Sequence, residues 1–396
     1  MKIRMQEILK MLFKIDLRIF LSTIVLSFFG LLMIASASMG LKTGDNSFLI
    51  SILFKQFIFV VSGLFMIVFC IRYFNFNILA KNMTKIMYVT AVLLLVAGFS
   101  KEVGGAKAWI TLPLPGLKVS IQPSEFAKIT VILMVAHFLS DKRDMNVSEW
   151  DFSKKTIVWF ALYFFLILVL QSDLGSASVL LFIGMMIYLI PTHRLLYRYQ
   201  RWNMLFIVLG VFGVALLLSP IGVKIISSLG IADYKVNRFI VAADPFSDKL
   251  GTGYQLVNGL ISFASGGLFG LGFGTSIRKY TNFPAANTDF ILAIIVEELG
   301  IVGFIIIFTC YILIIYRLFY WALKMKNQKG KVILIGTAMY IFIHFVFNVG
   351  GGTALIPLTG VPLLMISQGG SSTMSIMMCI GLSLSVIHMY KSGVIV

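Results

Sequence analysis

The chain has 396 residues, of which 59% are hydrophobic, 14% aromatic and only 12% charged. This composition excludes an ordinary soluble domain, because a soluble core needs far fewer apolar residues. The formal net charge is +17, yet the 33 basic residues are spread along the chain, which argues against nucleic-acid binding. Repeated runs of roughly 17 to 25 apolar residues, each enough for about 30 Å of hydrocarbon, predict an all-α polytopic integral membrane protein.

About ten transmembrane helices are predicted, in a single domain that covers residues 1–396. Residues 1–18 precede the first span, and a large loop at residues 221–289 separates the seventh span from the eighth. The fourth, fifth and sixth spans are short or polar at one end. The predicted spans lie at 19–38, 56–72, 83–99, 125–140, 156–171, 176–191, 203–220, 290–316, 332–350 and 373–389.

The distribution of basic residues predicts the orientation of the chain. With a cytoplasmic N-terminus, 21 of the 33 Lys and Arg residues fall in inside segments and 12 in outside segments, most of them in two long loops. We therefore expect both termini in the cytoplasm. The first span imitates a secretory signal ending in Ala35-Ser36-Ala37, but it is longer than a usual signal core and is expected to stay uncleaved.

The two long outer segments, residues 100–124 and 221–289, are rich in glycine, and long ordered loops tend to carry function. Residues 254–263 predict a surface helix with its apolar face in lipid. The glycines at 266, 267, 270, 272 and 274 fit no nucleotide-binding spacing. They predict either a tightly packed re-entrant loop or a backbone that approaches a phosphate-bearing ligand.

Three carboxylates lie close together in PAANTDFILAIIVEELG, residues 284 to 300. Asp289 stands where the eighth span begins, so it either caps that helix together with Thr288 or serves a function at the outer face. Glu297 and Glu298 lie inside the apolar run, where an acid cannot face lipid cheaply. They form either a structural pair with a base on another helix or part of a wet cavity.

Other polar groups converge on the same outer face. Glu125 and Lys128 stand at the start of the fourth span, and Asp173 lies between the fifth and sixth. Each acid has a plain alternative role as a helix cap or turn residue, but Lys128 is a cation entering the membrane. The last outer segment, residues 349–372, is apolar but broken by prolines and glycines, which predicts re-entrant backbone beside a cavity.

These motifs occur together, in order, over nearly the whole chain: QPSEFAKI (122–129), QSDLG (171–175), DPFSD with GTGYQ and SGGLFGLG (244–272), NTDFILAIIVEELG (287–300) and PLTGVPLLMISQGGSS (357–372). The set resembles the shape, elongation, division and sporulation family of bacterial membrane proteins. The stretch GTSIRKYTNFPAANTDF slightly favours the division type over the elongation type.

The resemblance implies a ten-helix peptidoglycan glycosyltransferase that polymerises lipid II at the outer face of the bacterial cytoplasmic membrane. It implies that Asp289 is the essential acid, which suits a general base in an inverting transfer to a sugar hydroxyl. It also implies a partner, a single-pass class B penicillin-binding protein that acts as transpeptidase. Two other functions stay open: a lipid II flippase with a polar path across the membrane, and a scaffold that recruits the transpeptidase.

The candidate substrate-binding residues share a position at or near the outer face and a polar or charged side chain suited to sugars and diphosphate. No tightly bound cofactor is expected, and a divalent cation such as Mg²⁺ or Mn²⁺ is left open. The candidates are Lys107, Glu125, Lys128, Asp173, Arg238, Gln255, Arg278, Lys279, Thr288 and Glu298.

The sequence departs from the family pattern at two places. Where members commonly read P-E-x-H-T-D, this chain reads Pro-Ala-Ala-Asn-Thr-Asp at 284–289, so it lacks the Glu and the His. Where members read G-A-x-R-W, it reads Gly-Ala-Lys-Ala-Trp at 105–109. A cation from this second motif would have to come from Lys107.

Overall fold

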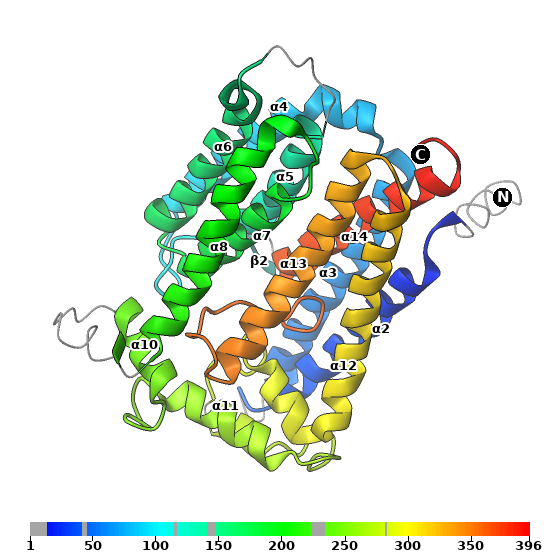
Figure 1. Ribbon diagram of the computed structural model, residues 1–396. Helices are drawn as coiled ribbons and strands as arrows, with labels where there is room; N and C mark the ends of the chain where they lie inside the picture. Colours follow the sequence, from blue (N-terminus) through cyan, green and yellow to red (C-terminus); the bar gives the residue numbers. More distant parts are fainter. Residues whose placement is uncertain are drawn as a thin grey trace, which may run out of the picture.

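The computed structural model describes residues 14–41, 46–114, 117–140, 147–219, 221–222, 234–281 and 283–396. Most of the predicted N-terminal segment and part of the predicted loop 221–289 therefore lie outside the described residues. Figure 1 shows a bundle of long helices, with shorter elements lying across one end of it.

Ten long helices of the described chain coincide with the ten predicted spans (Figure 1). Two further helices, α10 (Tyr234–Ala243) and α11 (Tyr254–Ser265), belong to the large loop. The long helices are α2 (Leu17–Ser38), α3 (Asn46–Tyr73), α4 (Phe76–Gly98), α5 (Pro123–Phe138), α6 (Glu149–Phe165, continued by the π-helical turn η1, Leu166–Leu170), α7 (Leu174–Tyr188), α8 (Tyr197–Leu217), α12 (Ile291–Lys324), α13 (Gln328–Gly352) and α14 (Gly370–Lys391). Short 3₁₀ turns are η2 (Arg194–Leu196) and η3 (Arg278–Tyr280).

Eight of these helices are long and apolar enough to cross a membrane. The other two are α5 and α7, with 16 and 15 residues, so the prediction of short fourth and sixth spans is confirmed. Both lie inside the bundle: every residue of α5 except Phe126 and His137 is buried. A helix enclosed by its neighbours need not match the bilayer thickness, because its ends and side chains contact protein instead of lipid.

One element departs from the all-α prediction. Residues Ile110–Leu114 (β1) and Leu117–Ile121 (β2) pair antiparallel, with Leu114 opposite Leu117. Pro113 is tolerated in β1 because this is a two-stranded sheet with open edges. The hairpin leads directly into α5, so it sets where that helix begins.

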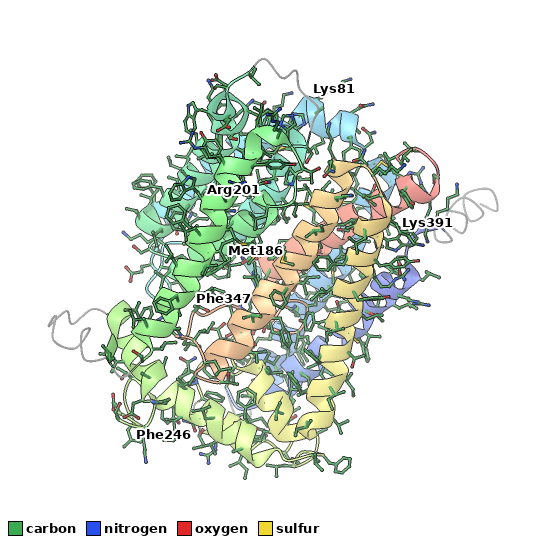
Figure 2. All side chains as sticks on the ribbon, in the orientation of Figure 1. Lys81, Met186, Arg201, Phe246, Phe347 and Lys391 are labelled. Atoms are coloured by element: carbon green, nitrogen blue, oxygen red, sulfur yellow. The ribbon has the colours of Figure 1, made fainter. Side chains whose placement is uncertain are left out.

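The start of α2 and the end of α14 lie on one face of the bundle. Lys391 Nζ donates to the carbonyl of Ile15 at 2.8 Å, whereas Ser38, at the far end of α2, contacts Asn287. Figure 2 places Lys81, Arg201 and Lys391 toward one end of the bundle and Phe246 at the other. We call these ends the terminal face and the loop face. The predicted even number of spans requires this arrangement.

The helix predicted at 254–263 is present as α11, but the prediction that its apolar face lies in lipid is wrong. Leu256, Val257 and Gly259 are buried against protein, because the start of α12 occupies that side. A Cβ atom on Gly259 would lie 2.6 Å from the ring of Phe290.

The glycine-rich loop packs onto a break in α12. Gly300 adopts φ 66° and ψ −162°, which frees the preceding carbonyls from the helix. The amides of Leu271 and Gly272 donate to the carbonyls of Glu297 and Glu298 at 2.9 and 3.0 Å. A Cβ on Gly270, at φ 77°, would lie 2.2 Å from the Glu298 carbonyl oxygen. Close packing is thus observed at Gly266 and Gly270, and positive φ at Gly267, Gly270, Gly272 and Gly274.

The segment between α13 and α14 re-enters the bundle as predicted. A Cβ on Gly30, in the middle of α2, would lie 2.6 Å from the carbonyl oxygen of Met365. Tyr311 donates to the carbonyl of Leu364, and Asn348 Nδ2 donates to that of Val361 at 2.9 Å. Side chains of neighbouring helices thus donate hydrogen bonds to backbone carbonyls of the re-entrant segment, which have no partner within a helix.

Candidate active site

A cavity of about 560 Å³ opens at the loop face, and it gathers the polar motifs into one site. Segment 103–109, the re-entrant segment 358–362 and the starts of several helices form its walls. Its polar and charged lining residues include Gln122, Glu125, Lys128, Asp173, Ser176, Arg238, Gln255, Thr288, Asp289, His344, Gln368, Ser371 and Ser372.

The N-terminal ends of four helices, α5, α7, α12 and α14, border this cavity. Each helix N-terminus carries roughly half a positive charge and unpaired N–H groups. The starts of α5, α12 and α14 have no side-chain capping hydrogen bond. The cavity is therefore suited to an anionic group, although few cations line it.

Asp289 lies on the cavity wall and does not cap α12. The N-cap residue of that helix is Phe290, and no side chain caps it. Within the described chain the carboxylate has no hydrogen-bond donor, while the backbone carbonyl accepts from Asn348 Nδ2 at 2.9 Å. Burial raises the pKa of the carboxyl to about 6, although the Arg238 charge lowers it. A carboxyl with that pKa is mostly ionised at neutral pH. Because the pKa is near the working pH, the group can both accept and release a proton.

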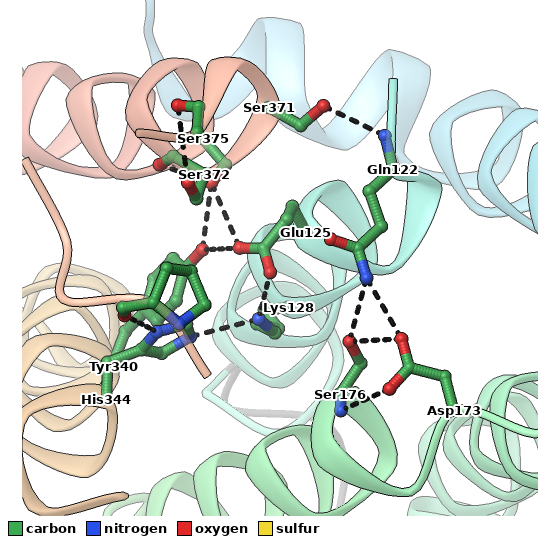
Figure 3. A network of polar contacts seen from close by, with 12 residues as sticks. Gln122, Glu125, Lys128, Asp173, Ser176, Tyr340, His344, Ser371, Ser372 and Ser375 are labelled. Atoms are coloured by element: carbon green, nitrogen blue, oxygen red, sulfur yellow. Dashed lines mark hydrogen bonds and ion pairs between the residues drawn. The ribbon is translucent and has the colours of Figure 1, made fainter. Parts of the chain in front are cut away.

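The floor of the cavity is a buried polar network on α5, α13 and α14 (Figure 3). Lys128 Nζ lies 2.6 Å from Glu125 Oε1 and 3.0 Å from His344 Nε2. Tyr340 donates to Glu125 Oε2 at 2.6 Å and contacts Ser375 Oγ at 2.8 Å. Glu125 and Lys128 are thus a structural pair that also lines the cavity.

Lys128 keeps one donor available. An ammonium has three N–H donors, and two point to Glu125 and His344. No other described residue accepts from it, and only 1% of the residue is exposed. A buried cation with a spare donor beside a cavity is placed to bind an anionic ligand oxygen.

Asp173 caps α7 and also lines the cavity. Its Oδ1 accepts from the amide of Ser176 at 2.9 Å and so caps α7, while Oδ2 accepts from Gln122 Nε2 at 2.9 Å (Figure 3). The same carboxylate lines the cavity. It therefore joins the starts of α5 and α7 at one wall.

Arg238, Gln255 and Thr288, which are three of the candidate substrate-binding residues, also line the cavity. Arg238 donates to the carbonyl of Leu358 at 2.9 Å, and Gln255 to that of Pro284 at 3.2 Å. Arg238 and Gln255 also line a smaller cavity of about 230 Å³ beside α10 and α11.

Lys279 and Glu298 do not line the cavity, so their predicted substrate contact is not seen. They form a fully buried ion pair of 2.9 Å with Ser36 between them. Glu297 accepts from Ser262 and Ser276 at 2.9 and 2.7 Å. Glu298 thus shows the structural alternative, but its base comes from the turn η3 and not from another helix. Glu297 is structural without a base, because it accepts only from hydroxyls and backbone amides of the described chain.

Lys107 and Arg278 also lie outside the cavity lining. Lys107 is exposed, and only its backbone amide is engaged, with the carbonyl of Gln171. Arg278 is half-buried, and its amide lies 3.5 Å from Glu297 Oε1. In the glycine-alanine motif, Gly105, Ala106 and Trp109 form the wall.

Sequence reasoning missed His344, Tyr340 and Gln368. For His344 and Tyr340 the signal available was a polar residue inside an apolar span, which normally faces a bundle interior, whereas Gln368 lies in the re-entrant segment. Asn287, which stands where the family has His, donates to Gln368 Oε1 at 2.5 Å, and its carbonyl accepts from the Gln368 amide at 2.9 Å. These bonds hold the loop that carries Asp289 against the start of α14.

Fold and site together define a multi-pass membrane protein with a polar site at one membrane face. The sequence profile described as "Cell cycle protein", for FtsW, RodA and SpoVE, matches residues 16–392. The chain belongs to this family.

Individual relatives agree over most of the chain. It is 31% identical to stage V sporulation protein E of Bacillus subtilis (strain 168), covering 94% of this chain and 96% of that protein. It is 32% identical to the peptidoglycan glycosyltransferase MrdB of Escherichia coli (strain K12), over 77% of each.

Two solved structures share the fold. A chain from a peptidoglycan synthase complex has a TM-score of 0.69 at 25% identity, covering 95% of this chain and 98% of that one. Thermus thermophilus rod shape determining protein RodA has a TM-score of 0.64 at 23% identity, covering 95% and 97%.

Proposed function

We propose that this chain is a peptidoglycan glycosyltransferase that polymerises lipid II. The observation that carries the proposal is the carboxylate of Asp289, which has no hydrogen-bond donor among the described residues and lies on a cavity bordered by four helix N-termini. Relatives at about 30% identity over most of the chain are named peptidoglycan glycosyltransferases, which supports the same activity here.

In the proposed reaction, Asp289 acts as general base. A sugar hydroxyl of the acceptor gives its proton to the carboxylate, and its oxygen attacks the anomeric carbon of the donor. The bond from that carbon to the lipid diphosphate breaks, and the diphosphate leaves with the electron pair. Attack opposite the leaving group inverts the anomeric configuration, and no covalent enzyme intermediate is needed.

The leaving diphosphate needs positive charge beside it. We assign this role to the spare donor of Lys128, to Arg238 and to the uncapped helix starts, all of which border one cavity. The described residues hold no group of three or more His, Cys, Asp or Glu side chains that could bind a metal. A divalent cation such as Mg²⁺ or Mn²⁺ would therefore bind mainly through diphosphate oxygens, and EDTA followed by metal readdition tests this.

The orientation and the partner are also proposals. Most basic residues of the described chain belong to segments at the terminal face, which supports a cytoplasmic position for that face and an outer position for the cavity. A similar chain occurs in a peptidoglycan synthase complex, which supports a class B penicillin-binding protein as transpeptidase partner. The division and elongation types remain two alternatives for the setting of this activity.

The deciding experiment compares polymerisation of labelled lipid II by the wild-type protein, Asp289→Asn and Asp244→Asn, each purified with the cognate transpeptidase. Asp244 is an exposed acid of the same loop outside the cavity lining. We expect glycan chains from wild type and Asp244→Asn, and a loss of at least about 100-fold in Asp289→Asn.

Asp289→Asn is expected to fold, because a carboxyl whose pKa is raised by folding lowers stability once it is ionised. Equal product from Asp289→Asn and wild type would reject the proposed base. A wild-type protein that makes no chains but moves lipid II across the vesicle membrane would favour the flippase. A protein that binds its partner and shows neither activity would favour the scaffold.

A further inference from the structure

A second cavity, of about 290 Å³, lies between α5, α6, α7 and α8. It shares no lining residue with the cavity that holds Asp289. Its residues come from the later turns of α5 and α7 and the early turns of α6 and α8, so it lies toward the terminal face. They are Val131, Val135, Thr156, Ile157, Phe160, Gly184, Met185, Tyr188, Tyr199, Trp202, Asn203 and Phe206.

The cavity exists because α8 packs loosely. In the most apolar 18-residue stretch of this span only 6% of the residues are buried, whereas 83% are buried in the corresponding stretch of α14. Figure 1 shows α8 running along the outside of the bundle. The gap between α8 and its neighbours is lined mainly by aliphatic and aromatic side chains, so it suits a hydrocarbon chain.

One polar group in this cavity has no partner. Thr156 is 3% exposed, and its hydroxyl makes no hydrogen bond to any described residue. Other helical threonines donate to the carbonyl four residues earlier, as Thr23, Thr90 and Thr337 do at 2.8 to 2.9 Å. A buried hydroxyl without a partner is unfavourable, so Thr156 indicates an acceptor supplied by a ligand.

The elements that line this cavity carry exposed cations near the terminal face, and we take these cations as its rim. Five exposed cations lie on α6, η2 and the first turns of α8: Lys154, Lys155, Arg194, Arg198 and Arg201. Glu149 and Asp151 are the acids on these elements, and Asp151 pairs with Lys154. The net positive rim favours a phosphate group at the membrane surface.

We propose that this cavity binds one membrane phospholipid from the leaflet at the terminal face. An acyl chain fills the apolar cavity, an ester carbonyl accepts from the Thr156 hydroxyl, and the phosphate lies among the basic side chains of the rim. The lipid fills the gap beside α8 and satisfies the one buried hydroxyl that the described chain leaves unpaired there.

The test is native mass spectrometry of the protein released from vesicles of phosphatidylglycerol and phosphatidylethanolamine into detergent. Wild type is expected to retain one phospholipid. Val135→Phe fills the cavity and is expected to lose it, while Val158→Phe, on the lipid-facing side of α6 with 55% exposure, retains it. Thr156→Val keeps the shape but removes the donor, and a roughly tenfold lower retained fraction is expected, as one lost hydrogen bond predicts.

Retention of the phospholipid by Val135→Phe at the wild-type level would overturn the proposal. So would a wild-type protein that carries only detergent, or a bound polypeptide in place of the lipid. Quenching of Trp202 fluorescence by acyl-brominated phosphatidylglycerol gives an independent readout, with Trp202→Phe as the reference. Quenching that Val135→Phe leaves unchanged contradicts the assigned cavity.

Discussion

At the residue scale, the carboxylates in and around the site differ in the groups that they contact. Glu125, Glu297 and Glu298 accept hydrogen bonds from hydroxyls, amides or lysines, and so does the capping Asp173. Asp289 alone among these five has no described donor for its carboxylate. A base must have its lone pairs accessible to substrate, so this difference in bonding supports the role proposed for Asp289.

The pKa of Asp289 predicts the pH dependence of polymerisation. The carboxylate must be ionised to accept a proton, so the rate is expected to fall as the pH drops through about 6 and to level off above it. The Arg238 charge lowers this pKa, so Arg238→Gln is expected to move the inflection to higher pH. The measurement is the initial rate of glycan synthesis between pH 5 and pH 9.

If Arg238→Gln leaves the inflection at the same pH, the inflection belongs to a group other than Asp289. Glu125, Lys128, His344 and Asp173 are the other titratable side chains that line the cavity, and substitution of each identifies which one titrates.

At the element scale, the break in α12 and the glycine-rich loop form one unit. The loop pairs with carbonyls freed at Gly300, and the side chains of Glu297 and Glu298 bind the turn that follows it. This unit lies directly behind the segment that carries Asp289. It holds the start of α12 in place without contacting the cavity.

Two glycines of this loop offer a matched test. Gly270→Ala adds strain at φ 77° and places a Cβ 2.2 Å from the Glu298 carbonyl oxygen, whereas Gly267→Ala adds strain at φ 54° with nothing within 4 Å. We expect Gly267→Ala to lower the free energy of unfolding by about 1 kcal/mol. Gly270→Ala is expected to cost at least about 1 kcal/mol more. Thermal unfolding in detergent measures both, and equal losses would contradict the packing described.

At the scale of the whole molecule, Asp16 joins three helices at the terminal face. Its Oδ1 caps α2, and its Oδ2 accepts from Arg317 Nε at 2.8 Å and Trp321 Nε1 at 2.5 Å, both on α12. Lys391 of α14 lies over the Trp321 ring, 5.0 Å from its centroid. Burial raises the pKa of Asp16, but the bonds from Arg317 and Trp321 outweigh it and leave the pKa lowered.

Because the folded-state pKa of Asp16 is lowered, its stabilisation is present at neutral pH and is lost in acid, below about pH 4. Asp16→Ala also leaves Arg317 largely buried without its partner and is expected to lower the free energy of unfolding by about 3 kcal/mol. Lys154→Ala, which breaks an exposed pair, is expected to lower the free energy of unfolding far less. A double-mutant cycle of Asp16 and Arg317 that showed no coupling would refute the contact.

Local patterns in the sequence sufficed for the ten spans, the re-entrant last segment and the gathering of polar motifs at one face. Of the three spans predicted to be short or polar at one end, α5 and α7 are short, whereas the fifth has 22 residues. Apolar runs report burial in lipid or protein, and prolines and glycines report backbone breaks, so both can be read within a short window. Asp289 was singled out by family resemblance, and no structural contact tests its catalytic role.

Only the tertiary structure decided which charged residues line the cavity and which hold the fold together. Glu298 meets Ser36, and Tyr340 meets Glu125, across separations of 262 and 215 residues. Such pairs depend on how helices pack, which no local pattern contains. The same physics explains why α11 lies on protein instead of lipid: the sequence shows an apolar face, and the fold determines what covers it.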